Sequence, residues 1–517
     1  MRKAALFLFT LLTLSWMASC GSQSPVATAP PTNPAVSNVP VGLTVTDTPP
    51  AGVTVLFFQL SITGATMTNS SGSSVSLLSS TNPVPVNVSD LLTESAFLGS
   101  QNVAAGTYSN LSLTFSNPQL TIFNASDSSI SSTCAVGKVC QITPSTSGPL
   151  TLTFSSAPFP VTLAASSPLA FKLDIHLDTV IQSDLTLNLA TANGVTVSEI
   201  SPPQSGGPIP LIGKLRGTIA SLGTNQFTLQ REEGKTFTIN VNSSTTYSYP
   251  SSVCSANAFS CLATGQAVKV TITLQSDGTL LATAVDYVQL ATQKTVVGNI
   301  IGLSTSGGNT IMDLIIQQQP MASNAAILPV GHHARVTVPI TGVTYSIDSG
   351  SFTIPSGLTF ASISDLQVGQ EVQVVLQGTV TPAVSSGNSN WNGPSPVGPP
   401  DVLFTASSSA LEPSQITGTV AGINASALSF TLATLPVFFV PPSATLGATP
   451  ILAPVIITIQ TTSATTFSNF TTNGISGLAV NDVVSIHGWV FSTPTGATKV
   501  TVAADKVVDR PGPTPLF

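Results

Sequence analysis

Residues Leu262–Val270 read LATGQAVKV, and the chain contains this pattern three times in related form. Each copy places a Leu-containing turn before a strand rich in valine, because Gly and Asn favour turns and β-branched residues favour strands. The other two copies are LQVGQEVQV (Leu366–Val374) and LAVNDVVSI (Leu478–Ile486). The pattern therefore predicts that the C-terminal part of the chain is built from repeated β units.

Further segments repeat in the same order around these turns. Each unit opens on a short strand with a central glycine, has a strand end of the type TTYS, VTYS or TTFS, and continues into the valine strand. This order predicts a small five- or six-stranded antiparallel barrel, whose closure leaves no free edge; an elongated meander is the alternative. The repeats are placed at residues 211–290, 294–411 (with insertions) and 414–510 (with a Pro-rich insertion).

Residues 41–200 also have patterns typical of β-strands, but these differ from the patterns of the repeated units. Segments such as VTVLFFQLSIT (Val53–Thr63) and TYSNLSLTF (Thr107–Phe115) are β-branched and aromatic with partial alternation. One short helical segment is expected around Val88–Ser100. The predicted fold class is all-β: an N-terminal antiparallel β-sandwich followed by three small antiparallel β-barrel-like repeats.

The N-terminus has the features of an export signal. Arg2 and Lys3 precede the uncharged segment AALFLFTLLTL (4–14), which is too short to span a bilayer. The following MASC resembles the lipobox of bacterial lipoproteins. That resemblance implies that residues 1–19 are removed, that Cys20 is lipidated and anchors the chain to a membrane, and that residues 20–40 form a Pro/Ser-rich tether. An ordinary signal peptide with a spare cysteine is the alternative.

By the same resemblance, Gly21 replaces the Asp that retains many lipoproteins at the inner membrane. The expected location is therefore the cell envelope, at the outer membrane, either periplasmic or surface-exposed.

The other four cysteines form two local pairs, Cys134 with Cys140 and Cys254 with Cys261. In an exported protein such pairs predict disulfides. A metal site is the alternative, but neither pair has further Cys or His nearby.

Charged residues make up only 7% of the chain, and the 14 Lys and Arg residues are not clustered. Nucleic-acid binding requires clustered basic groups, so that class is excluded. After the signal there is no uninterrupted apolar run of about 18 residues, and membrane contact is expected through the lipid alone.

No motif of a known catalytic class is present, and we expect neither an enzyme nor a bound cofactor. On a strand, the sequence LDIHLD would place Asp174, His176 and Asp178 on one face, where they could hold a divalent metal and activate water; a strand with one wet face is the alternative. Trp391, in an Asn-rich loop, is a candidate for stacking on a sugar ring, or packs on its own domain. His487 and Trp489 alternate on a predicted strand, where core packing is expected.

Two resemblances concern the domains. LTVTDTPPAGVTVLFFQLSITGATM, VNVSDLL and VAAGTYSNLSLTF resemble a bacterial lipoprotein domain of unknown function, and the three repeats resemble a small secreted domain of unknown function. Neither resemblance implies an activity. The expected role is therefore non-catalytic: a lipid-anchored scaffold or binding module that contacts polysaccharide or another surface protein. A carbohydrate-binding accessory protein is the second hypothesis and a metal-dependent hydrolase the third.

Overall fold

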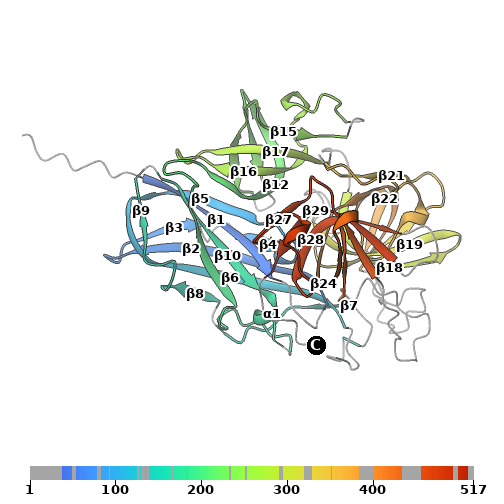
Figure 1. Cartoon of the computed structure of the whole chain (residues 1–517), viewed down its shortest axis with the longest axis horizontal. Helices are drawn as coiled ribbons and strands as arrows, with labels where there is room; N and C mark the ends of the chain where they lie inside the picture. The colour runs from blue at the N-terminus through green and yellow to red at the C-terminus, as the bar shows by residue number, and fades with distance from the viewer. Residues whose placement is uncertain are drawn as a thin grey trace, which may run out of the picture. The chain divides into compact units, whose positions relative to one another are not determined.

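Strands form most of the chain in this computed structural model, which confirms the all-β prediction (Figure 1). Within the described residues the one α-helix, α1 (Leu177–Val180), is a single turn. No helix in the described part has the length and apolar character needed to cross a membrane. The structure describes residues 38–510 except 49–53, 79–82, 92, 125–128, 130–133, 136–138, 149, 166, 183, 232–233, 251–252, 290–294, 319–328, 351, 383–400, 434–455 and 493–498.

The N-terminal domain is a β-sandwich. Side chains of both sheets, such as Val41 and Leu43 from one and Leu60 and Ile62 from the other, share one apolar core. Its pairing is mostly antiparallel, but β1 and β10 run parallel. One sheet contains β11 (Val195–Ile200), β10 (Leu169–His176), β1 (Asn38–Thr48) and β5 (Ala96–Ala104); the other contains β3 (Ser74–Leu78), β2 (Thr54–Asn69), β6 (Gly106–Phe123), β7 (Val139–Ile142), β4 (Val84–Asn87), β8 (Thr151–Phe154) and β9 (Val161–Leu163).

The helix expected around residues 88–100 is a 3-10 turn, η1 (Val88–Leu91), followed by β5. The apolar spacing has another cause, because β5 is buried on both faces. Phe97 belongs to the core of the first repeat, and its neighbour Leu98 belongs to the sandwich core.

The three repeats have the same six strands in the same order. In each repeat, the sixth strand pairs with both the third and the fifth strand. The short fourth strand also pairs with the sixth strand. The strands are β12 (Ile209–Gly223), β13 (Gln226–Gln230), β14 (Thr236–Asn240), β15 (Thr246–Ser248), β16 (Ala267–Leu274) and β17 (Leu280–Gln289) in the first; β18 (Thr295–Ser306), β19 (Asn309–Gln318), β20 (His333–Val338), β21 (Thr344–Ile347), β22 (Glu371–Pro382) and β23 (Val402–Glu412) in the second; β24 (Ser414–Asn424), β25 (Ser429–Leu432), β26 (Ile456–Gln460), β27 (Thr466–Ser468), β28 (Val483–Ser492) and β29 (Lys499–Asp509) in the third.

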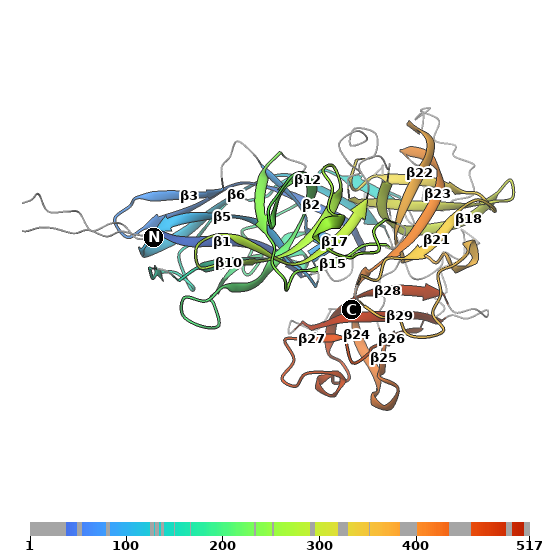
Figure 2. The same cartoon turned by 90° about the horizontal axis from the view of Figure 1, so that it is seen from above.

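Each repeat is therefore a closed five-stranded barrel. Figure 2 labels the strands of the third repeat, β24 to β29. The strand that closes each ring is parallel to its neighbour: β14 with β17, β20 with β23 and β26 with β29. The other ring pairings are antiparallel, as predicted. Closure satisfies the backbone groups that an open sheet would leave at its edges.

The repeated turn has a conformational cause. Gly265, Gly369 and Asn481 stand at equivalent positions with φ of 86°, 94° and 77°. Each also donates its backbone N–H to the first strand of its repeat, at 2.8, 2.8 and 2.9 Å. Asn enters the left-handed region more readily than other residues with a Cβ, so it preserves this turn where glycine is absent.

The Thr-rich strand ends also have a defined role. The Thr245 hydroxyl donates to the carbonyl of Ala282 at 2.8 Å, and the Thr465 hydroxyl donates to that of Ala504 at 2.6 Å. These bonds tie the segment before the short fourth strand to the closing strand of the same barrel.

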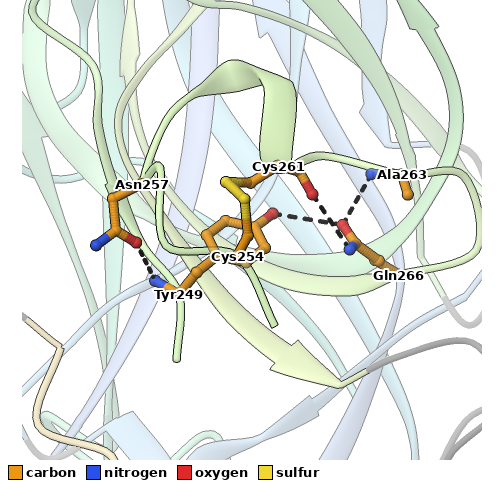
Figure 3. Close-up of a disulfide and its surroundings, with 6 residues drawn as sticks. All are labelled: Tyr249, Cys254, Asn257, Cys261, Ala263 and Gln266. Atoms are coloured by element: carbon orange, nitrogen blue, oxygen red, sulfur yellow. Dashed lines mark hydrogen bonds between the residues drawn. A yellow bond between two sulfur atoms is a disulfide. The ribbon is translucent and has the colours of Figure 1, made fainter. Parts of the chain in front are cut away.

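Both predicted disulfides form. Cys134 bonds Cys140 with a Cα–Cα distance of 5.4 Å, and Cys254 bonds Cys261 with 5.7 Å. The second lies in the long connection between β15 and β16, where Gln266 accepts a hydrogen bond from the Ala263 backbone N–H at 2.8 Å (Figure 3). The disulfide thus closes a loop that hydrogen bonds already order.

Candidate functional site

The structure places two of the three residues of the predicted metal strand together. Asp174 and His176 lie on β10 with Oδ2 and Nε2 3.8 Å apart, and their side chains are 23% and 27% exposed. The strand ends there, and Asp178 lies in α1, so the prediction that all three share a strand is wrong. The Thr179 hydroxyl donates to the His176 carbonyl at 2.9 Å, which stabilises the turn. The described residues contain no group of three or more His, Cys, Asp or Glu side chains arranged to hold a metal ion.

Cys20 and Trp391 lie outside the described residues. The lipid anchor and the sugar contact therefore stay predictions.

A cavity whose wall contains many charged residues is the most distinctive feature of the described chain. It has a volume of about 700 Å³, and the N-terminal domain and all three repeats contribute to its wall. This is the size range of small-molecule sites, which span roughly 300 to 1,000 Å³. The charged residues in the wall are Glu94, Lys214, Arg216, Arg231, Lys269, Asp286, Asp348, Glu371, Glu412 and Asp505.

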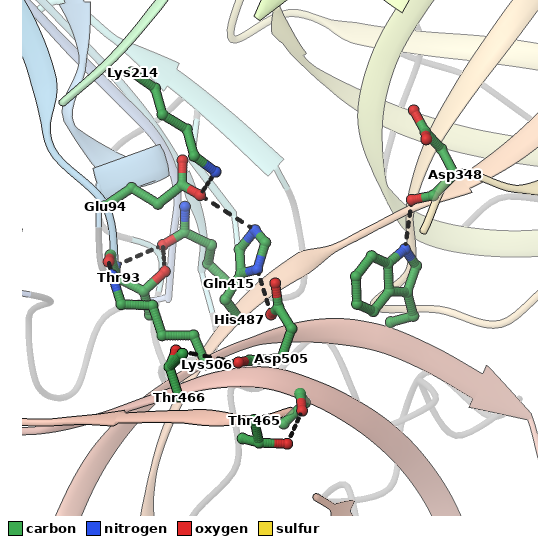
Figure 4. A network of polar contacts seen from close by, with 12 residues as sticks. Thr93, Glu94, Lys214, Asp348, Gln415, Thr465, Thr466, His487, Asp505 and Lys506 are labelled. Carbon is green, nitrogen blue, oxygen red and sulfur yellow. Dashed lines mark hydrogen bonds and ion pairs between the residues drawn. The ribbon is translucent and has the colours of Figure 1, made fainter. Parts of the chain in front are cut away.

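Glu94, between η1 and β5, pairs with basic side chains that line the cavity, and Figure 4 shows it beside Lys214 and His487. Its carboxylate pairs with Lys214 and lies 3.3 Å from the Lys269 ammonium, both on the first repeat. Burial alone would raise the pKa of Glu94, but Lys214, Lys269 and His487 outweigh it and hold the pKa well below its ordinary value. Glu94 is therefore ionised over the physiological pH range.

The neighbouring Thr93 links the N-terminal domain to the third repeat. Its backbone N–H donates to Gln415 Oε1 at 2.9 Å, and its carbonyl accepts a hydrogen bond from Lys506. Glu94 and Thr93 together connect three domains at one wall of the cavity.

His487 joins this network from β28. Its Nδ1 lies 2.7 Å from Asp505 Oδ1, and its Nε2 lies 3.6 Å from Glu94 Oε1. The sequence predicted core packing for both His487 and Trp489. Trp489 lies in the shared core of the second and third repeats, as predicted. His487 instead lies in the polar wall of the cavity.

Four acidic residues of the cavity wall, Asp286, Asp348, Glu371 and Glu412, are defined together as the acidic wall, and Asp286 is the direct cross-strand partner of Lys269. Burial and the charge of Asp286 raise the pKa of Asp348 to about 6. Burial, Asp348 and Glu371 raise the pKa of Glu412 well above its ordinary value. Burial also raises the pKa of Asp286, against the pull of Lys214 and Lys269. Closely spaced carboxyl groups in a partly enclosed site cannot all ionise at their ordinary pH.

An aromatic pair borders the acidic wall. Phe352 and Trp489 stack with ring centroids 5.2 Å apart and an interplanar angle of 12°. The Trp489 indole N–H donates to the backbone carbonyl of Asp348 at 2.9 Å (Figure 4). Both rings line the cavity, which therefore combines charge with an apolar face.

Sequence reasoning missed this cavity. Its charged residues extend along the chain from Glu94 to Asp505, and none of them belongs to a catalytic or binding motif. The available signal was compositional: in a chain with 7% charged residues, KLRG with Lys214 and Arg216, and VKV with Lys269, place bases inside otherwise apolar strands. A charge within a strand of a closed barrel indicates a buried polar contact or a site.

Comparison with known families gives two matches. Residues 38–198 match the family described as Domain of unknown function (DUF4382). Residues 216–286, within the first repeat, match the family described as Domain of unknown function (DUF5666). No curated protein matches the chain.

Proposed function

We propose that this chain is a lipid-anchored protein of the cell envelope that acts by binding, not by catalysis, and that the charged cavity is its ligand site. The lipobox-like MASC supports the anchor at Cys20. The two local cysteine pairs, joined as disulfides, suit an oxidising compartment. By its sequence features the anchor belongs to the outer membrane.

The observation that carries the binding role is the concentration of charge in the cavity. The chain has only 14 Lys and Arg and 21 Asp and Glu residues, yet ten charged side chains line this one space. Partly buried charges destabilise a fold unless they are paired, so their gathering is not explained by stability alone. Perturbed carboxyl groups in a concave site are typical of functional sites.

The packing of the domains suits a preformed site. Phe97 of the sandwich lies in the core of the first repeat, and Trp489 and Phe491 of the third repeat lie in the core of the second. Leu56 and Phe57 of the sandwich pack with Ile301 and Ile315 of the second repeat. Shared apolar cores favour a fixed platform over a flexible spacer, and a preformed site avoids the entropy of ordering on binding.

The anchor is tested by mass spectrometry of the mature protein purified from membranes. The expected N-terminal peptide begins at Cys20 and carries fatty acyl chains, and Cys20→Ala should move the protein to the soluble fraction. An unacylated Cys20 in the native protein would overturn the proposed anchor.

The site is tested by filling the cavity without changing its charge. Ser349, which lines the cavity, is replaced by Trp, and the exposed Ser221 receives the same change as the control. Purified proteins are screened by thermal shift against envelope polysaccharide fragments, sugars, amines and peptides. Ligands that stabilise the wild type and S221W should fail to stabilise S349W. If every ligand stabilises S349W as well as it stabilises S221W, the cavity is not the site.

A further inference from the structure

Uncharged amide side chains line the cavity between its charged groups. They include Gln59 from the sandwich, Gln230 from the first repeat, and Gln318 and Gln373 from the second. Within the part of the chain that the structure describes, none of these four carboxamides has a hydrogen-bond partner. Each carboxamide has an acceptor oxygen and two N–H donors. The cavity therefore offers neutral donors and acceptors that the fold itself does not use.

Strand pairing places two of these amides in one row on the second repeat. Val297 of β18 is opposite Gln318 of β19 on one side and opposite Gln373 of β22 on the other. Directly opposed residues lie on the same face of a sheet, and all three line the cavity. Two strand spacings separate the amides, which is about 10 Å. The row can therefore contact two different groups of one extended ligand.

The sandwich holds a third amide beside this row. Gln59 of β2 is opposite Asn87 of β4. The Asn87 side chain donates to the carbonyl and to the Oε1 of Gln317, each at 3.1 Å, and Gln317 donates to the Leu56 carbonyl at 2.7 Å. The residue after Gln317 on β19 is Gln318. These bonds between the sandwich and the second repeat therefore bring the unpartnered Gln59 and Gln318 to the same part of the cavity wall.

Several of the charged groups in the cavity already have partners of opposite charge. Lys269 is the cross-strand partner of Asp286 and lies 3.3 Å from Glu94, which also pairs with Lys214. A charged ligand would have to compete with these pairs, and it would lose its own hydration on entry. An uncharged ligand leaves the pairs intact. The lining therefore favours a ligand that binds through hydrogen bonds between neutral groups.

We propose that the cavity binds a short, uncharged oligosaccharide. A sugar hydroxyl both donates and accepts hydrogen bonds, and a carboxamide offers both roles in return. Gln318 and Gln373 bond hydroxyls on the side of the second repeat, and Gln230 bonds hydroxyls on the side of the first. A volume of about 700 Å³ is within the range of small-molecule sites. This inference rests on the proposed function of the cavity and names its ligand class.

The test is isothermal titration calorimetry of the full-length protein. The neutral probes are cellotriose, maltotriose, mannotriose and tri-N-acetylchitotriose; trigalacturonic acid is the charged probe and acetyl-trialanine amide the peptide probe. At least one neutral trisaccharide should bind more tightly than the charged probe and the peptide probe. Its affinity should stay nearly constant between about 0.05 M and 0.5 M salt, because salt screens charges and not hydrogen bonds between neutral groups.

Variants connect the binding to the amides. Methionine has nearly the length of glutamine but lacks the carboxamide, so Gln318→Met and Gln373→Met should each weaken binding about three- to tenfold, the loss expected for one hydrogen bond between uncharged groups. Gln226→Met is the matched control, because Gln226 is exposed on β13 and lies outside the cavity lining. All three variants should unfold at the temperature of the wild type, since these amides have no partner to lose.

Three results would overturn the inference: no binding of any neutral trisaccharide, tighter binding of the charged or the peptide probe, or unchanged affinity in both Q318M and Q373M. These are separable from failure of the proposed function. If S349W abolishes binding of another ligand class and no trisaccharide binds, the cavity is a site and its ligand class is wrong. If filling the cavity affects no ligand of any class, both proposals fail.

Discussion

Replacing Glu94 by Gln should destabilise the folded chain more than any other single loss of charge in the cavity. The side chain of Glu94 is 12% exposed, and its carboxylate forms ion pairs with Lys214, Lys269 and His487. At the 3.3 Å separation from Lys269, the attraction is about 5 kcal/mol at an effective dielectric constant of 20. Gln removes this attraction and leaves two lysines close to each other.

The expected loss of unfolding free energy in E94Q is smaller than the sum of the pair energies. The two lysine side chains are 30% and 32% exposed, so water recovers part of the loss. Breaking a buried pair by removing one partner typically costs about 3 to 5 kcal/mol, and we expect about 3 kcal/mol here. For one cooperative unit of roughly 480 residues, at about 2.1 cal/mol/K per residue, this corresponds to a fall of about 3 °C in the unfolding midpoint.

The assay is thermal unfolding of the wild type, E94Q and Glu199→Gln, an exposed control on β11. Because the folded-state pKa of Glu94 is lowered, its stabilisation is present above its ordinary pKa of 4.5 and is lost as the pH falls through the depressed value. The difference in unfolding midpoint between the wild type and E94Q should therefore be largest at pH 7 and decrease only in strong acid. An E94Q midpoint within the error of E199Q at pH 7 would refute the role of Glu94 as the centre of the network.

Four further outcomes are expected. Asp348→Asn should raise the free energy of unfolding at pH 8 by up to about 3 kcal/mol and leave it unchanged near pH 3.8, because the penalty of ionising this carboxyl grows as pH rises towards its folded pKa of about 6. Differential scanning calorimetry at both pH values checks the sign. Asp313→Asn should lose about 3 to 5 kcal/mol in chemical denaturation, since buried Asp313 lies 2.8 Å from both His333 and Arg335. Asn481→Ala should cost about 1 kcal/mol and Asn481→Gly almost nothing, measured by the same denaturation, because φ is 77° there. Cys254→Ser should lose about 2.4 kcal/mol, and reductant should lower the midpoint of the wild type but not of a variant that lacks both cysteine pairs.

The repeats show how far local sequence determines this protein. The Gly265, Gly369 and Asn481 turns, the Thr245 and Thr465 hydroxyls and the Cys254–Cys261 pair all act within a few residues or within one barrel. Backbone conformation, β propensity and short loops depend on nearby residues, so the all-β class, the repeated units and both disulfides were predictable. The helix predicted near residue 97 failed because Phe97 and Leu98 serve two different cores, which local periodicity does not encode.

The cavity was decided by the tertiary structure alone. Glu94 meets Lys214, Lys269 and His487 only after three domains have packed, and Glu371 meets Glu412 through the register of two strands that are joined by a long insertion. Electrostatic interaction depends on distance in space, and the separation along the chain does not report it. The sequence therefore determined what each domain is, whereas the packing of the domains determined where the rare charges gather and what they can bind.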